Sequence, residues 1–236
     1  MISDEKLDRG DRTDGRPARR RSLTGSMLLL VWAAWIAGPA LAADEEEPRI
    51  TAEPRAIIED TAGRVVAVLA QKDRPAEERV AEIEAIAYEI FDFATMSRLV
   101  LARSWRKLDR EQRVEFVREF KRHLSRTYGT RLDRYDQERV DVYAAQLEPR
   151  DDVSIRTRIV GGQFDGAEIS YRLRKRNEQW RIIDVVIEGV SLVSNYRSQF
   201  AEVLNSGTID DLLSRLRDKN FEVEEEEKPS EARAQR

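Results

Sequence analysis

The sequence has no cysteine and only one histidine among its 236 residues. Without cysteine the chain cannot form a disulfide, a thiolate nucleophile or a lipid-modified cysteine anchor. Zinc sites draw mainly on histidine and cysteine, and His123 is the one such ligand available. These absences exclude a disulfide framework, thiol chemistry and an ordinary zinc centre, so the domain must be held together by its own hydrophobic core.

Long apolar runs are missing as well. The longest, Met27 to Ala37, is shorter than the roughly 20 residues that a membrane-spanning helix needs. Three arginines precede it, and Ala40-Leu41-Ala42 follows. A basic region, a short apolar core and an A-x-A end are typical of a secretory signal peptide. We therefore expect residues 1–42 to be a signal peptide cleaved after Ala42, with a retained anchor as the alternative.

An excess of basic residues is also absent. The chain carries 41 basic and 45 acidic residues, a net charge of -4. Because the leader holds more basic than acidic residues, its removal makes the balance more acidic. A nucleic-acid-binding protein usually has a basic face, so we predict no nucleic-acid partner. Residues 221–236 are acidic and poor in apolar residues, which predicts a disordered tail.

Helical periodicity dominates the first half of the mature chain. Apolar residues recur every three or four positions in 54–71 and in the stretches after Pro75 and Asp92. The longest helix should begin after Asp109, which forms a capping box with Gln112. Its predicted core stripe is Val114, Val117, Phe120, Leu124, Tyr128, Leu132 and Tyr135.

Alternation with period two then predicts strands at 140–147, 153–159, 167–174 and 180–187, and helices follow at 192–204 and 208–219. Helices segregated from a run of antiparallel strands make an α+β domain. We expect one domain, residues 43–220. A helical N-terminal half should pack on a twisted antiparallel sheet of about four strands, which C-terminal helices close.

Three places invite an enzymatic interpretation. The run 189–193 lies between a strand and a helix, as a hydrolase nucleophile elbow does, but it lacks the second glycine and a later histidine. Ser191 is more simply a helix cap. Asp184 and Glu188 suit acid/base work, or bond nearby backbone or arginines. His123 suits a surface or flanking position. We therefore predict no enzyme, catalytic residue, metal or cofactor.

Two blocks carry a family resemblance: D-F-A-T-M-S-R-L-V-L-A-R-S-W-R-K, Asp92 to Lys107, and Q-W-R-I-I-D-V-V-I-E-G-V-S-L-V-S-N-Y-R-S-Q-F, Gln179 to Phe200. With the order of elements around them, they resemble the MlaC (toluene-tolerance auxiliary) family of periplasmic phospholipid carriers. Ala102 departs from the pattern, since relatives often have glycine there. The resemblance implies an apolar pocket between sheet and helices that takes acyl chains, with the headgroup near its mouth.

The resemblance also implies lipid-binding positions. The family's pocket-lining strand positions fall on Ala167, Ile169 and Tyr171, and the Gly-Val-Ser junction adds Val190. Alternation along the neighbouring strand adds a second group: Ile155, Thr157 and Ile159. Candidates from the helices complete the predicted site: Phe93, Met96, Leu99, Phe120 and Tyr128. Any of these residues is alternatively ordinary core.

The expected function is therefore that of a monomeric periplasmic carrier with phospholipid as its cargo. The resemblance implies two partners, an inner-membrane ABC transporter with a lipid-binding ring and an outer-membrane lipoprotein complex, in a system that maintains outer-membrane asymmetry. Two alternatives remain open. One is a pocket enzyme on a cone-shaped α+β fold, using Asp184, Glu188 and tyrosines, and the other is a fully packed periplasmic adaptor.

The export prediction can be tested directly. Since Ala40 and Ala42 supply the small residues that a signal peptidase requires, the mature protein should begin at Ala43. Intact-mass analysis of protein isolated from the periplasm measures this, and a mass that retains the Met27 to Ala37 segment would contradict it.

Overall fold

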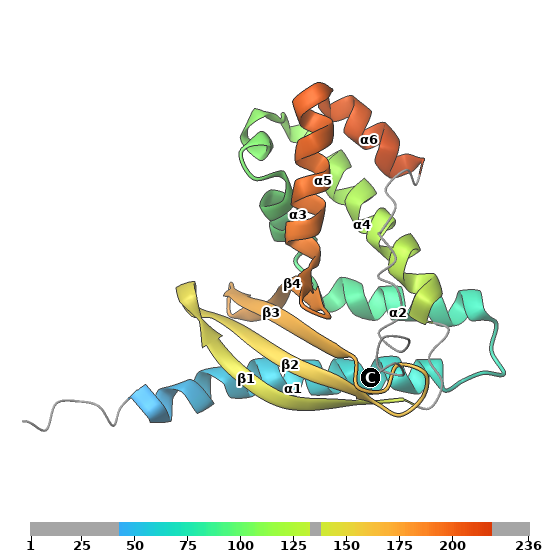
Figure 1. Ribbon diagram of the computed structural model, residues 1–236, viewed down its shortest axis with the longest axis vertical. Coiled ribbons are helices and arrows are strands. Elements are labelled where there is room, and N and C mark those ends of the chain that lie inside the picture. Colours follow the sequence, from blue (N-terminus) through green and yellow to red (C-terminus); the bar gives the residue numbers. More distant parts are fainter. Residues whose placement is uncertain (1–42, 133–137, 219–236) are drawn as a thin grey trace, which may run out of the picture. The chain divides into compact units, whose positions relative to one another are not determined.

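The computed structural model describes residues 43–132 and 138–218, with side chains for 49–129 and 138–218 (Figure 1). The predicted signal peptide and acidic tail, and Tyr135 of the predicted stripe, lie outside the described residues. Five helical segments come first: α1 (Ala43–Leu69), α2 (Ala76–Ile90), α3 (Phe93–Leu101), the 3-10 helix η1 (Ser104–Lys107) and α4 (Arg110–Leu132). Two helices close the described chain: α5 (Leu192–Ser206) and α6 (Ile209–Arg217).

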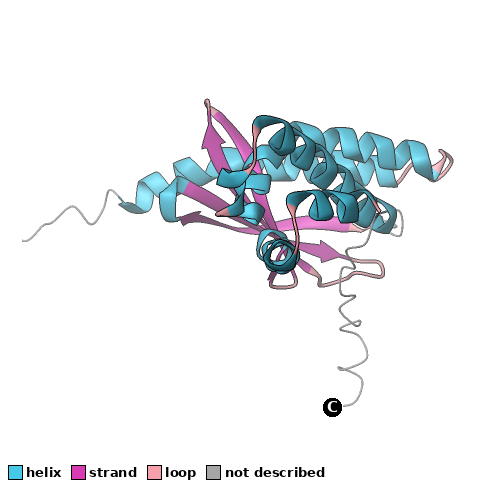
Figure 2. Ribbon diagram, turned by 90° about the horizontal axis from the view of Figure 1, so that it is seen from above, coloured by secondary structure: helices cyan, strands magenta, loops and turns pink. Residues whose placement is uncertain are grey.

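The strands between these helices form one antiparallel sheet in the order β1-β2-β3-β4-β5. They are β1 (Arg139–Glu148), β2 (Asp152–Val160), β3 (Glu168–Arg176), β4 (Gln179–Ile187) and the two-residue β5 (Val190–Ser191), with a short 3-10 turn, Pro149–Asp151, between β1 and β2. The strands fan out from one another, as expected for a twisted sheet (Figure 2). The predicted α+β class is thus confirmed, with the short β5 added to the four strands expected.

Tight turns set the register at the β4 end of the sheet. Glu188 and Gly189 both have positive φ, 48° and 85°, and join β4 to β5 so that Ile187 faces Val190. Two successive residues with positive φ are what a type I′ hairpin turn requires, and glycine adopts this conformation without steric cost. The turn therefore carries the chain from the sheet to the start of α5 within a few residues.

Three hydrophobic clusters organise the described residues, the smallest of them, Val68, Leu69, Ile83 and Ile86, between α1 and α2. The sheet cluster lies on the inner face of the sheet, beneath α1, and its buried members are Ile58, Val142, Val153, Ile155, Leu173, Trp180, Ile182 and Val185. The helix cluster joins α3, α4, α5 and α6 around Phe116, Phe120, Tyr196 and Phe200. Phe91 and Leu192 pack against both the sheet cluster and the helix cluster, so these two residues connect the helical layer to the sheet.

Asp92 fixes the same junction with polar contacts. Its carboxylate accepts hydrogen bonds from the Thr95 backbone amide, at 2.8 Å, and hydroxyl, at 2.6 Å, so it caps α3 as predicted. Its own amide donates to the Ile182 carbonyl in β4, at 2.9 Å. Burial raises the pKa of Asp92, but the Thr95 hydrogen bonds and the charge of Arg176 outweigh this effect and leave the pKa below its ordinary value.

The structure differs from the sequence prediction in two helices. Helix α1 begins at Ala43, so Pro54 lies inside it and not in its first turn; buried Pro54 and half-buried Ile50 pack these extra turns against the domain. In α4 the capping box of Asp109 and Gln112 is confirmed. Val114, however, is 63% exposed, because the α4 face turned toward the core carries Phe116, Phe120 and Leu124.

Ala102 provides a stability test. It ends α3 with φ 47° and ψ -116°, a backbone conformation that is unfavourable for every residue with a Cβ atom. Ala102→Gly should therefore stabilise the protein by about 1 kcal/mol in urea unfolding followed by circular dichroism. The control is Ala201→Gly, at an exposed site inside α5, which should lose about 1 kcal/mol. Equal losses in both variants would contradict the assignment of strain to Ala102.

Candidate functional site

The strand candidates lie on one face of the sheet. A cross-strand row runs from Val142 through Thr157, Ile169 and Ile187 to Val190, each paired with the next. Residues that pair directly across antiparallel strands project to the same face, so Val190 belongs to the same surface as the β2 and β3 candidates. The alternation of β2 and β3 therefore gathers these predicted side chains as expected.

The neighbouring row adds two further candidates. Ala145, Ile155, Tyr171 and Val185 pair across β1 to β4, and Ile155 belongs to the sheet cluster while Tyr171 packs against it. Beyond the first row, the Ile159 amide donates to the Ala167 carbonyl at the end of β2. All seven strand candidates thus occupy adjoining positions on the sheet.

Exposure increases along the first row from Thr157 to Val190. Val142 is 7% exposed and Thr157 is fully buried, whereas Ile169 and Ile187 are half-buried and Val190 is 40% exposed. Helix α1 explains the gradient, because it packs mainly along β1 and β2 (Figure 1). The inner face is thus partly exposed at the β4–β5 hairpin, at Ile187 and Val190, although Ile182 and Val185, earlier in β4, are buried.

Three neighbours of this surface were missed by the sequence prediction. Ile187 continues the row, while Phe91 and Leu192 border the sheet cluster. The hairpin register would have identified Ile187, since it faces Ile169. Phe91 lies between two helices and Leu192 at the start of another, where neither period two nor period 3.6 marks an inward position.

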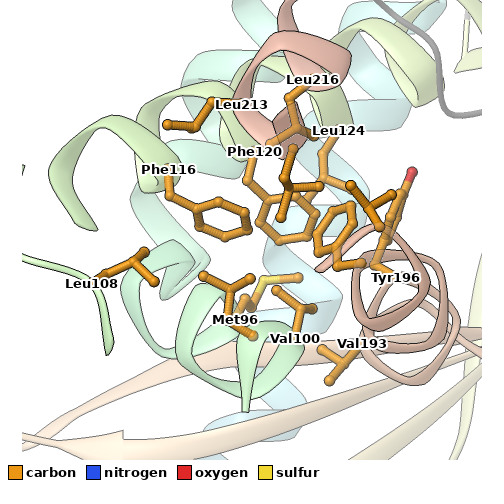
Figure 3. Packing of buried hydrophobic residues seen from close by; sticks show 14 residues of the cluster. Met96, Val100, Leu108, Phe116, Phe120, Leu124, Val193, Tyr196, Leu213 and Leu216 are labelled. Atoms are coloured by element: carbon orange, nitrogen blue, oxygen red, sulfur yellow. The ribbon is translucent and has the colours of Figure 1, made fainter. Parts of the chain in front are cut away.

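The helix candidates lie in the other cluster. Met96 and Phe120 are almost fully buried in the helix cluster (Figure 3), where the Phe120 ring lies 5.3 Å from that of Tyr196 and 5.6 Å from that of Phe200. Phe93, Leu99 and Tyr128 are half-buried against the same cluster. The structure therefore separates the helix candidates from the strand candidates, with Phe91 and Leu192 between them.

Two hollows on the surface are lined by other residues. One of about 420 Å³ lies between α1 and β1 and is lined by Arg55, Glu59, Ala62, Gly63, Val66 and residues 139–142. Another of about 440 Å³ lies along α4 and is lined by Arg110, Glu111, Val114, Glu115 and Arg118. Neither includes a predicted site residue.

The residues considered for catalysis have structural partners. Ser191 caps α5, its hydroxyl accepting from the Ser194 amide at 3.0 Å, which confirms the cap prediction. Asp184 accepts from the Ser191 hydroxyl at 2.6 Å and from the Val193 amide at 3.1 Å, so it supports the same helix start. Glu188 accepts from the backbone amide of Glu168. The two carboxylates therefore bond nearby groups separately and do not form one acid/base pair.

His123 is buried, so of the two expected positions, surface or flanking, the surface position is wrong. Its side chain faces α5, where its Nε2 atom lies 3.0 Å from the Tyr196 hydroxyl. Burial, and secondarily the charge of Arg126, lowers the pKa of His123 to about 4. The ring is thus neutral at pH 7 and joins α4 to α5.

Comparison with known proteins identifies the family. The family model described as "MlaC protein" matches residues 59–218, which is more than half of the chain. This chain belongs to the MlaC family. Within residues 43–132 and 138–218, no helix is long and apolar enough to cross a membrane.

Individual relatives are distant. Toluene tolerance protein ttg2D of Pseudomonas putida is 26% identical over 99 residues, 42% of this chain and 46% of that protein. The intermembrane phospholipid transport system binding protein MlaC of Haemophilus influenzae is 24% identical over 123 residues, 50% of this chain and 56% of that protein. The chain thus spans about half the length of the curated relatives it matches.

A solved structure shares the fold. The phospholipid-binding protein from Ralstonia solanacearum, in complex with a phospholipid, superposes with a TM-score of 0.63 and 22% identity. The match covers 70% of this chain and 96% of that one. At this identity the likeness establishes the common fold of the two proteins.

The histidine predicts a pH dependence of stability. Its pKa is about 4 in the folded state and about 6.5 when unfolded, so the unfolded chain binds the proton first and stability falls as pH drops through this window. The free energy of unfolding should decrease by about 2 kcal/mol from pH 7 to pH 5. Asp92, with its lowered pKa, loses its contribution only at more acidic pH.

Urea titrations at several pH values measure this dependence. His123→Gln removes the chain's one histidine and should abolish most of the loss between pH 7 and pH 5. Tyr196→Phe retains the histidine and should keep the slope even if it lowers stability overall. The same slope in His123→Gln as in the wild type would show that other groups cause the dependence.

Proposed function

We propose that this protein is a non-enzymatic carrier of phospholipid in the periplasm. The observation that carries the proposal is the exposure gradient across the inner sheet face, from buried Thr157 to exposed Val190. Family membership supports it, as does the shared fold of a protein solved with a phospholipid bound. The predicted signal peptide supports the compartment.

The energetics explain why an apolar surface without polar machinery suits this task. Burying one methylene is worth about 0.8 kcal/mol, so exposing two chains of about 14 methylenes each costs on the order of 20 kcal/mol. A carrier in an aqueous compartment must cover most of that surface. Because the chains themselves supply the binding energy, the site requires aliphatic and aromatic side chains more than directed hydrogen bonds.

In this proposal the acyl chains lie against the strand candidates, at the β3 to β5 end of the inner face. Ile169, Tyr171 and Val190 contact the lipid directly, and Ala167, Ile155, Thr157 and Ile159 form the surface beside and beneath them. Phe93, Leu99 and Tyr128 adjoin from the helical side. Met96 and Phe120 reach the lipid only if the helix cluster opens, because both are enclosed in it.

The proposed partners follow from the Haemophilus relative, whose name places it in an intermembrane phospholipid transport system. We propose that this chain, as a monomer, exchanges lipid with an inner-membrane ABC transporter bearing a lipid-binding ring and with an outer-membrane lipoprotein complex. Such exchange would help to maintain outer-membrane asymmetry.

Substitutions on the sheet test the carrier function. Protein purified from the periplasm should yield stoichiometric phospholipid on solvent extraction and mass spectrometry. Val190→Asp and Ile169→Asp should reduce bound lipid several-fold, because a carboxylate among acyl chains bears a large desolvation cost. Val190→Asp should leave the melting temperature nearly unchanged, since Val190 already contacts solvent.

Two matched variants complete the test. Val114→Asp changes an exposed valine on α4, away from the sheet, and should affect neither lipid nor melting temperature. Ile155→Asp changes a fully buried residue and should unfold the domain. Wild-type protein without phospholipid would overturn the carrier function. Wild-type lipid content in folded Val190→Asp and Ile169→Asp would place the lipid elsewhere.

A further inference from the structure

Lys121 is a half-buried lysine on α4 that forms no ion pair with an acidic residue among the described residues. Its neighbours on the helix, Arg118 and Arg122, both pair with Glu119, at 3.0 and 3.3 Å. Within the part of the chain that the structure describes, no carboxylate oxygen lies within 4.0 Å of the Lys121 ammonium. Its Nζ atom lies instead 3.1 Å from the centre of the Tyr88 ring and 5.7 Å from that of Phe93.

Two hydroxyl groups lie beside this ammonium. Ser125 follows Lys121 by one helical turn, so both side chains project from the same face of α4. The Ser125 hydroxyl is 3.1 Å from the hydroxyl of Tyr88, which comes from α2. A cation and two hydroxyls thus gather where α2 packs against α4; because one hydroxyl donates to the other, the ammonium and the second hydroxyl have protons left for an acceptor.

Aromatic rings connect this polar group to the sheet. The Tyr88 ring meets Phe93 edge-on at 5.8 Å, and Phe93 stacks on Phe91 at 5.5 Å. Phe91 packs against the sheet cluster as well as the helix cluster. A continuous apolar path therefore leads from the inner face of the sheet to Lys121, where it ends in a positive charge.

We propose that Lys121, with the hydroxyls of Ser125 and Tyr88, binds the phosphate group of the carried lipid. The inference rests on the proposed carrier function and names the polar end of its site. The acyl chains of a phospholipid need apolar cover, and its phosphodiester is bound well by a cation with hydrogen-bond donors. The sheet face and the rings of Phe91 and Phe93 offer the apolar cover, and Lys121 with the two hydroxyls offers the cation and donors.

The position of Lys121 suits a phosphate. Lysine binds phosphate as a point charge with three donors, and contact with a ring on one side leaves donors for an anion on the other. Lys121 as a residue is half-buried, and its ammonium is held against the Tyr88 ring, which fixes the position of the charge that an anion would meet. The exposed edge of Tyr88, at 36%, leaves the group open to solvent for a headgroup.

The test compares two ligands with identical short acyl chains, a phosphatidylglycerol and the corresponding diacylglycerol, on lipid-free protein by titration calorimetry. Lys121→Met should lower the affinity for the phosphatidylglycerol about tenfold and leave that for the diacylglycerol unchanged. Lys121→Arg should retain the preference of the wild type. Lys107→Met, at an exposed site on η1, removes the same charge and should change neither affinity.

The outcomes separate this inference from the carrier function. Binding of neither ligand by the wild type would overturn the carrier function itself. An unchanged preference in Lys121→Met, or an equal loss in Lys107→Met, would overturn the phosphate site while leaving the carrier intact. Inorganic phosphate added alone is the remaining arm. If it competes with the phosphatidylglycerol at equal concentration, the group is a free-phosphate site and not a headgroup site.

Discussion

The apolar inner face of the sheet is larger than the area that helix α1 covers. Much of the architecture follows from the need to cover the rest of this face. Helix α1 lies along β1 and β2 and buries Val142, Val153 and Ile155. Each such side chain contributes about 1.5–3 kcal/mol when it is fully buried. At Ile169, Ile187 and Val190 burial is incomplete, so this end of the face gains stability from apolar material that covers it, and in the proposed function this material is lipid.

A partly covered sheet requires support from elsewhere in the fold, and the helix cluster provides it. Phe116, Phe120, Tyr196 and Phe200 form a closed set of ring contacts that involves no strand candidate. Asp92 bonds both Thr95 in α3 and the β4 backbone, which holds this cluster to the sheet. The helix cluster thus packs independently of the partly exposed end of the sheet, so we expect a polar substitution at Val190 to leave the domain folded.

Local patterns predicted most of the fold because they are determined by near neighbours in sequence. Period-two alternation located β2 and β3, and the side chains of Asp92 and Asp109 marked helix starts. The errors arose where tertiary packing decides: a helical stripe read from sequence included Val114 and omitted Phe116, since both suit a period of 3.6 residues. The sequence predicts Met96 and Phe120 as helix-side candidates beside the strand group, and their position in the helix cluster depends on tertiary packing that local spacing does not show.

The same reasoning indicates where lipid selectivity can arise in such a carrier. A methylene that moves from a bilayer to an apolar protein surface remains in an apolar environment. The transfer of the acyl chains therefore changes the free energy little, and this allows fast exchange. Thr157 fits this requirement, because its hydroxyl donates to the Ile169 carbonyl and presents no unsatisfied polar group to a chain. Discrimination between lipids must then come from the headgroup end, where a single cation has a large effect because the rest of the binding surface is indifferent to charge.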